Sequence, residues 1–158
     1  MCIQNTPIVT AEMLSQLELL ERVKMLTEEE KNNAENINRT KVILHNPSKN
    51  NAMDVKVKMT AYVNERRINS SPPLDGSRDW HVQAGHSVLK VFKMEEDYLS
   101  PANCTIQSMA EETTEANKEK QFVLEIKLSY SDGCGRPIDN PPLSWCFDFK
   151  EMRWRFVI

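Results

Sequence analysis

Residues 55–63 read VKVKMTAYV, and the strict alternation of apolar and polar side chains along this stretch decides the fold class. Successive side chains of a β-strand point to opposite faces of a sheet, so this pattern is typical of a strand with one face in a core. The opposite face carries lysine, threonine and tyrosine, and we expect it to face water. The apolar face carries five side chains: Val55, Val57, Met59, Ala61 and Val63.

Further segments along the chain show the same alternation, or are short and bounded by turn residues as strands are. The last two of these segments, joined through Lys150 and Glu151, are expected to form a hairpin with aligned apolar faces. The predicted strands are 41–46, 53–63, 78–82, 86–94, 103–109, 122–130, 143–149 and 152–158.

Strands that are apolar on one face must bury those faces against each other. We therefore expect residues 41–158 to form a mainly β domain, an immunoglobulin-like antiparallel β-sandwich. A small β-barrel is the alternative architecture. The Cys…Trp…Cys spacing of true immunoglobulin domains is missing from the sequence, so the expectation concerns the architecture alone.

Residues 1–40 are expected to be a separate N-terminal helical segment. Apolar side chains recur at helical spacing over residues 10–37, and Thr10 is placed to cap the first turn. The run TEEE at 27–30 has the form of a capping box, which predicts a second helix after a break near Leu26. The helix is expected to pack against the β domain; a dimerisation or docking helix is the alternative.

Composition and charge exclude some classes of function. With 158 residues the chain suits one domain, which can bury a core without metal or disulfides. Residues 1–37 hold seven acidic and three basic side chains (−4), and the remainder holds 16 acidic and 17 basic side chains (+1), in agreement with the total of −3. Neither part has the basic excess that nucleic-acid binding requires, so we expect no nucleic-acid partner.

The sequence also predicts a location. No apolar run approaches the roughly 18 residues that span a bilayer, and the first residues lack the features of a secretory signal. The four cysteines are scattered and form no CxxC pair, which favours reduced thiols. We therefore expect a cytoplasmic protein that has no membrane partner.

Histidine and cysteine provide the candidate reactive side chains. His81 and His86 flank a turn and could approach a metal with help from cysteine, but no zinc-type spacing is present, so solvent-facing histidines are the favoured interpretation. Cys134 lies in DGCGR, where glycine amides and Arg136 could activate a thiolate. A flexible connection is the favoured interpretation of this loop, because the strand–turn–helix context of a nucleophile is missing. We predict no catalytic, metal or cofactor-binding residue.

The surface pattern favours contacts with other proteins. In RWR at 153–155, Trp154 points away from the two arginines, so it belongs to the core and cannot stack on a base beside them. The outward sides of the strands at 53–63 and 122–130 carry charges of both signs, as solvated sheet faces do. Sheet edges and loops are then the natural contact surfaces.

Three runs of sequence resemble a known family: VILHNPSKNNAMDVKVKMTAYVN (42–64), WHVQAGHSVLKVF (80–92) and EDYLSPANCTIQSMAEE (96–112). Residues 41–110 are similar to the first C-terminal β-barrel of transglutaminases, with Gly85, Tyr98, Ile106 and Ala110 at familiar places. The catalytic cysteine of that family lies between Gln and Trp, and none of the cysteines here has those neighbours. The resemblance therefore implies an accessory barrel without cross-linking activity.

These observations lead to three hypotheses about function. The leading one is a non-enzymatic interaction or scaffold module, whose protein partners bind through sheet edges, loops or the N-terminal helix. The second is an accessory or truncated transglutaminase-like domain with a regulatory role. The third is a small cysteine-dependent enzyme that uses Cys134 with His81 or His86. No cofactor is expected in the leading case.

Overall fold

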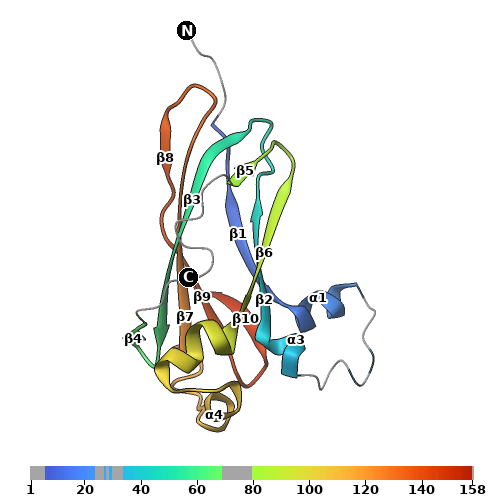
Figure 1. Cartoon of the computed structure of the whole chain (residues 1–158), viewed down its shortest axis with the longest axis vertical. Helices are drawn as coiled ribbons and strands as arrows, with labels where there is room; N and C mark the ends of the chain where they lie inside the picture. The colour runs from blue at the N-terminus through green and yellow to red at the C-terminus, as the bar shows by residue number, and fades with distance from the viewer. Residues whose placement is uncertain (1–5, 24–26, 28, 30–33, 69–79, 158) are drawn as a thin grey trace.

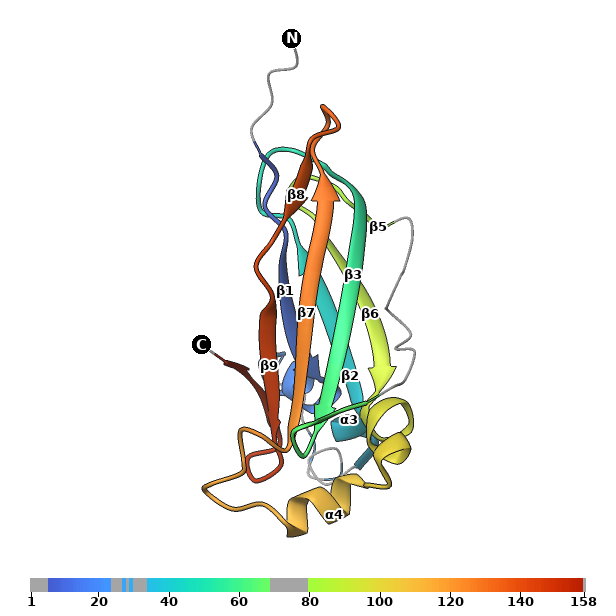
Figure 2. The same ribbon diagram turned by 90° about the vertical axis from the view of Figure 1, so that its left-hand side faces the viewer.

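The computed structural model describes residues 6–23, 27, 29, 34–68 and 80–157. These residues form a mainly β protein with two antiparallel sheets that run along the long axis of the molecule (Figures 1 and 2). The apolar faces of both sheets contribute to one core, so the structure confirms the predicted fold class at this level.

The smaller sheet has three strands, and its central strand pairs antiparallel with both neighbours. The N-terminal segment provides one of its edges. In spatial order the strands are β1 (Thr10–Ser15), β2 (Arg39–His45) and β6 (Ser87–Lys93).

The larger sheet is built around the two longest strands, which pair over most of their length. Strand β3, which contains residues 55–63, lies inside this sheet between β7 and β4. The main path runs β10 (Arg153–Val157), β9 (Leu143–Asp148), β7 (Phe122–Ser131), β3 (Ala52–Val63) and β4 (Arg66–Arg67); β5 (Trp80–Val82) pairs with β3, and β8 (Pro137–Asp139) pairs with β7. Neither path closes on itself, so the β-barrel alternative is wrong for the described residues.

The helices lie toward one end of the sheets, where β2, β3 and β6 have an end (Figure 1). The described helices are short, and none of them has the length and apolar character needed to cross a membrane. They are α1 (Gln16–Arg22), α3 (Ala34–Asn38), the π-helix η1 (Glu95–Leu99), the 3₁₀ helix η2 (Ser100–Ala102) and α4 (Ile106–Glu111).

The alternation in β3 and β7 correctly predicts their buried faces. The five apolar side chains quoted from 55–63 are all at most 4% exposed. The matching face of β7, from Phe122 to Tyr130, is buried to a similar degree and lies opposite them in the β3–β7 ladder. Across the core, the smaller sheet contributes Met13, Val42 and Phe92.

The predicted helix over residues 10–37 is wrong at its start. Residues 10–15 form strand β1, and α1 begins only after Ser15, which replaces Thr10 as the N-cap. Pairing with β2 buries Met13 and Ala11 in the shared core, and this tertiary gain overrides the local helical spacing. The break near Leu26 and most of the run at 27–30 lie outside the described residues. The division at residue 40 stays a prediction, although β1 pairs with β2 along its length.

The predicted strand at 103–109 is also wrong. Residues 106–111 form helix α4, because Thr105 and Ser108 make a reciprocal capping box at its start. Ile106 and Met109, three residues apart, then share the buried side of the helix. The final hairpin exists, but its turn spans four residues, Phe149–Met152, where two were expected.

Candidate functional site

Of the two histidines considered as possible metal ligands, the structure describes the side chain of one. His86 is exposed in the turn before β6, whereas the side chain of His81 lies outside the described residues. Among the described side chains, no group of three His, Cys, Asp or Glu residues could hold a metal ion.

Cys134 is disulfide-bonded, so the expectation of a reduced thiol at this position is wrong. A sulfur in a disulfide cannot act as a thiolate until it is reduced. Arg136, proposed as its activator, pairs instead with Asp132: Arg136 Nε donates to Asp132 Oδ2 over 2.8 Å. Asp132 Oδ1 also accepts the backbone N–H groups of Cys134 and Arg136, at 2.8 and 2.9 Å.

Asp132 organises this loop. Its pKa is held below the ordinary value of 3.8, chiefly by the hydrogen bond from the backbone of Arg136 and also by the backbone of Cys134 and the Arg136 side chain. A carboxylate that accepts several N–H groups is a common way to fix a tight turn. The geometry of DGCGR therefore fits a structural loop.

The other two described cysteines are free but poorly suited to nucleophilic chemistry. Burial raises the pKa of the Cys146 thiol, on strand β9, and of the half-buried Cys104 thiol. Raised values keep both sulfurs protonated at neutral pH, and a thiol is a far weaker nucleophile than a thiolate.

The outer face of the smaller sheet holds a row of polar groups that the sequence did not predict. His45 Nδ1 lies 2.7 Å from Ser87 Oγ, and His45 Nε2 lies 3.3 Å from Glu12 Oε2. The row crosses all three strands, because Ser87 on β6 is opposite His45 on β2, and Glu12 lies on β1. A carboxylate, an imidazole and a hydroxyl in this order resemble the groups of a nucleophilic triad.

Two features argue that this row is a surface network. Arg22 Nη2 lies 2.6 Å from Glu12 Oε1, so the carboxylate is neutralised by a guanidinium as well as facing the imidazole. The row stands on an open sheet face, and Ser87 lines none of the described hollows. A nucleophile needs a neighbouring space for the reacting group and donors for an oxyanion.

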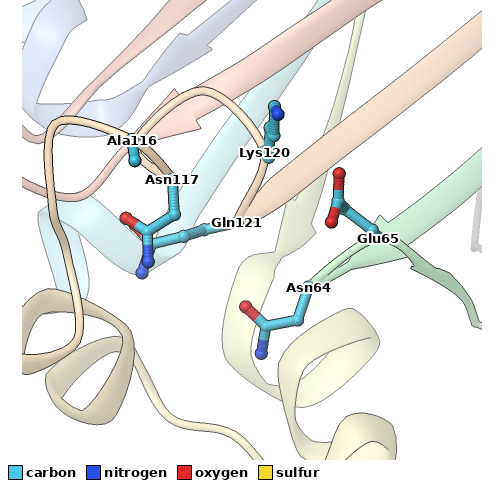
Figure 3. A pocket seen from close by; sticks show the side chains of 6 residues that line it. All are labelled: Asn64, Glu65, Ala116, Asn117, Lys120 and Gln121. Carbon is cyan, nitrogen blue, oxygen red and sulfur yellow. The ribbon is translucent and has the colours of Figure 1, made fainter.

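A pocket of about 230 Å³ lies between the β3–β4 turn and the loop before β7 (Figure 3). Asn64 and Glu65 come from the turn, and Asn117, Lys120 and Gln121 come from the loop, with Ala116 beside them. A second hollow, of about 260 Å³, shares Glu65 and Lys120 with it.

The amides that line this pocket are mostly used to hold the loop. Gln121 Nε2 donates to the Met109 carbonyl over 2.8 Å, and its Oε1 accepts from Thr113 Oγ1. Asn117 likewise caps the loop through Thr114 N and the Glu112 carbonyl. The remaining polar lining is the Asn64 amide, the Glu65 carboxylate and the Lys120 ammonium, and none of the lining residues is a Ser, Thr or Cys nucleophile. The pocket therefore offers no Ser, Thr or Cys nucleophile for covalent catalysis.

Strand β6 provides the most distinctive exposed feature. Leu89 and Val91 are each 46% exposed on the outer face of the smaller sheet. Among the described strands, β6 pairs only with β2, so no described strand hydrogen-bonds to its other edge. His86 O accepts from Asn46 N, and alternation along the strand then directs the backbone groups of Leu89 and Val91 to that outer edge.

Cationic side chains surround this edge. Lys90 and Lys93 lie on β6, and Arg39 and Lys41 lie on the neighbouring strand β2. In the strand register, Lys93 is opposite Arg39 and Val91 is opposite Lys41. The outer edge of the smaller sheet therefore combines apolar side chains, backbone hydrogen-bonding groups and positive charge.

The edge of the larger sheet at β10 is, by contrast, partly covered by helix α1. Glu18 Oε1 accepts the backbone N–H of Trp154 over 2.9 Å and that of Ser15 over 3.3 Å. Arg153 Nη2 lies 3.6 Å from Glu21 Oε2 on the same helix. A side chain that occupies an edge N–H prevents another strand from pairing there.

Glu18 should make stability depend on pH in a defined direction. Its pKa is raised above the ordinary 4.5 because burial disfavours the carboxylate more than the hydrogen bonds from Trp154 and Ser15 favour it. Its contribution to the free energy of unfolding is therefore complete below about pH 4.5 and is lost as the pH rises through the folded-state value. Relative to the wild type, Glu18→Gln should gain stability between pH 4 and pH 7, as measured by urea denaturation.

Glu18→Ala tests the hydrogen bonds themselves. It removes the capping box and the partner of the Trp154 N–H, and should lower the free energy of unfolding by about 1–3 kcal/mol. Glu21→Gln is the matched control on the same helix, and should cost under about 0.5 kcal/mol because its ion pair is exposed. For Glu18→Gln, a difference in the free energy of unfolding from the wild type that is the same at pH 4 and pH 7 would contradict the raised pKa of Glu18.

Two comparisons with known proteins found no match. No protein-family model matches the chain, and no curated protein sequence is significantly similar to it.

Sequence reasoning missed the β6 edge, although a signal was present. Residues 88–92 read VLKVF, with apolar side chains on both faces of the predicted strand. A strand in a sheet with one wet face should be apolar on one side only. Leu89 and Val91 break that rule, and they are the side chains that the structure leaves exposed.

Proposed function

We propose that this protein is a non-enzymatic interaction module in which strand β6 receives an extended, acidic segment of a partner protein. The observation that carries the proposal is the β6 edge, where exposed Leu89 and Val91 lie among cations. Strand addition to a free edge is a common mode of peptide recognition, in which backbone hydrogen bonds provide affinity and alternate side chains provide specificity.

The register of the sheet says what such a segment should look like. A strand beside β6 would hydrogen-bond to the outward backbone groups of Leu89 and Val91. Its apolar side chains would contact these two residues, while its acidic side chains would approach Lys41 and Lys93. The backbone N–H of Lys93 already donates to Asp97 Oδ2 over 2.8 Å, so pairing should stop before Lys93.

Val91→Pro tests the proposal directly. Proline removes an N–H that points to the outer edge, so the ladder between β2 and β6 keeps its hydrogen bonds. A capped peptide of alternating Glu and Val should shift the amide NMR signals of Leu89 and Val91 in the wild type. The variant should weaken its binding at least tenfold.

Val91→Thr is the matched control, because threonine is β-branched and keeps the N–H. It should retain most of the binding, and a peptide of alternating Lys and Val should bind the wild type at least tenfold more weakly than the acidic peptide. Equal binding of the two peptides, or shifts located away from β6, would overturn the proposal.

We further propose an immunoglobulin-like architecture for the two sheets. An immunoglobulin-like sandwich is supported by two antiparallel sheets that share one core. A regulatory domain related to transglutaminases is the second candidate, and it is supported only by the sequence resemblance of residues 41–110. Such a domain should bind a purified transglutaminase core, and a failure to do so would remove this candidate while leaving the β6 proposal intact.

A cysteine-dependent activity and a cytoplasmic location are two further proposals, and the state of Cys134 bears on both. A cysteine-dependent enzyme would first need reduction of the disulfide at Cys134. The cytoplasmic location was predicted from cysteines that were expected to be reduced. The disulfide at Cys134 argues against a reducing compartment.

A further inference from the structure

Three cations share the outer face of the smaller sheet, where β2 begins after α3 and β6 ends before η1 (Figure 1). Thr40 and Phe92 are buried on the core side of their strands, so alternation directs Arg39, Lys41 and Lys93 to the outer face. Arg39 is directly opposite Lys93 in the β2–β6 ladder. Together these three side chains form a cation cluster.

The register of the two strands brings the members of the cation cluster close together. Asn46 N donates to His86 O, and hydrogen-bonded and non-hydrogen-bonded pairs alternate along an antiparallel ladder. Arg39 and Lys93 are therefore a non-hydrogen-bonded pair, in which the Cβ atoms are only about 5 Å apart. Lys41 is the diagonal neighbour of Lys93, at roughly 7–8 Å. Long, flexible side chains can converge on one anion from these positions.

This arrangement is unfavourable for the sheet itself. Like charges directly opposite each other destabilise a pair of strands. Glu35 Oε2 lies 3.8 Å from Arg39 Nε, but both side chains are more than half exposed, so water screens this pair. Neither Lys41 nor Lys93 forms an ion pair with a residue that the structure describes. An external anion would relieve the repulsion.

The carboxylates of η1 have other partners. Glu96 Oε2 accepts from Asn38 Nδ2 over 2.9 Å. The pKa of Glu96 is lowered chiefly by this hydrogen bond, and the charge of Lys93 is the smallest of the causes. Asp97 Oδ2 accepts the backbone N–H of Lys93, at 2.8 Å. The side-chain ammonium of Lys93 is thus left for a further partner.

A phosphorylated side chain fits the cation cluster better than a carboxylate does. A phosphate monoester carries a charge of about −1.5 to −2 at pH 7 and presents three acceptor oxygens. A carboxylate carries one charge on two oxygens. Donors from three residues can therefore each bind an oxygen of the phosphate in a charge-assisted hydrogen bond.

The place of the cation cluster beside the β6 edge indicates that the phosphate belongs to a peptide. A strand paired with the outward backbone groups of Leu89 and Val91 would carry its next outer-face side chain past Lys93. A free phosphate or a lipid headgroup would leave both apolar side chains, each 46% exposed, uncovered. We propose that the partner segment is phosphorylated, with its phosphoserine or phosphothreonine bound by Arg39, Lys41 and Lys93; this inference rests on the proposed function of β6.

The test uses the full chain and capped peptides of alternating Glu and Val, in which the first or the last valine is replaced by serine or by phosphoserine. One phosphopeptide should bind about tenfold or more tightly than its serine counterpart, because one end of the peptide lies beside the cation cluster. The other phosphopeptide should show no such gain. Titration calorimetry measures the affinities, and amide NMR shifts of Leu89 and Val91 locate the binding.

A pair of double variants assigns the gain to the cation cluster. Arg39→Gln/Lys93→Gln should reduce the preference for phosphoserine to less than about threefold, because two of the three charged donors are lost. The matched control is Arg66→Gln/Lys90→Gln, which removes one arginine and one lysine from other places. Arg66 lines a hollow of about 540 Å³ at the end of β3, and Lys90 is opposite the buried Val42, on the other face of β6. The control should keep the full preference.

The outcomes separate this inference from the proposal on which it rests. If serine and phosphoserine peptides shift Leu89 and Val91 and bind equally tightly, the phosphate site is overturned and the β6 edge stands. If no peptide shifts these residues, both proposals fail. A control variant that loses the preference as completely as Arg39→Gln/Lys93→Gln would overturn the cation cluster as its source. Phenyl phosphate that binds as tightly as the phosphopeptide would overturn the requirement for a peptide.

Discussion

Trp154→Ala should lower the free energy of unfolding by about 3–5 kcal/mol, the range for truncating a large buried aromatic side chain. The indole is 5% exposed and packs edge-on against Phe122 and Phe147, with ring centroids 5.5 and 5.3 Å away. It also links the two sheets: Trp154 on β10 donates its Nε1–H to Thr40 Oγ1 on β2 over 3.1 Å. Urea denaturation followed by circular dichroism measures this loss.

A set of milder variants separates packing from the hydrogen bond. Trp154→Phe and Thr40→Val each remove one partner of the bond and leave the other buried, so each should cost about 1–3 kcal/mol. The double variant removes both polar groups and should cost less than the sum of the two single variants. A strictly additive double variant would show that the bond contributes nothing, and the loss in Trp154→Ala would then be packing alone.

Much of the β structure could be predicted because the side chains that form the core alternate in sequence. The buried face of β3 follows directly from VKVKMTAYV, and that of β7 from the apolar side chains between Phe122 and Tyr130. Trp154 was correctly placed in the core and its flanking arginines outside it. In each case the apolar side chains recur at every second residue, because alternate side chains of a strand point into the core.

The N-terminal segment shows where this reasoning fails. Residues 10–15 carry apolar side chains at positions that fit a helix as well as a strand, and only the partner strand β2 decides between them. The first turn of α1 has a clear cap in Ser15 and Glu18, but the helix starts later than the apolar spacing indicated. A short capping motif locates the start of a helix only when the residues before it do not pair with another strand.

Most of the surface features described above depend on contacts between segments that are distant in the chain, and a single sequence does not show such contacts. The hollow at the end of β3 needs β4 and η2, residues 66–67 and 100–102, to meet at one end of the molecule. The Glu12–His45–Ser87 row needs three strands in register. The exposed apolar pair on β6 is the exception, because its sequence already breaks the alternation.

The second large effect is expected at Asp148, whose side chain is completely buried at the β9–β10 hairpin. Its Oδ1 accepts the backbone N–H groups of Lys150 and Glu151, at 2.9 and 3.2 Å. Its Oδ2 lies 3.2 Å from Arg155 Nη2, an ion pair without the alignment of a hydrogen bond. Asp148→Ala removes all three interactions and should lower the free energy of unfolding by about 2–3 kcal/mol.

Asp148→Asn separates the turn from the charge. The amide oxygen can still accept both backbone N–H groups, so this variant should cost only about 1 kcal/mol. Arg155→Gln should cost less than about 1 kcal/mol, because the arginine side chain is 44% exposed and its ion pair is screened by water. If Asp148→Asn proves as destabilising as Asp148→Ala in urea denaturation, the charge of the buried carboxylate matters more than the turn. The ion pair with Arg155, despite its poor alignment, would then contribute more to stability than the hydrogen bonds of the turn.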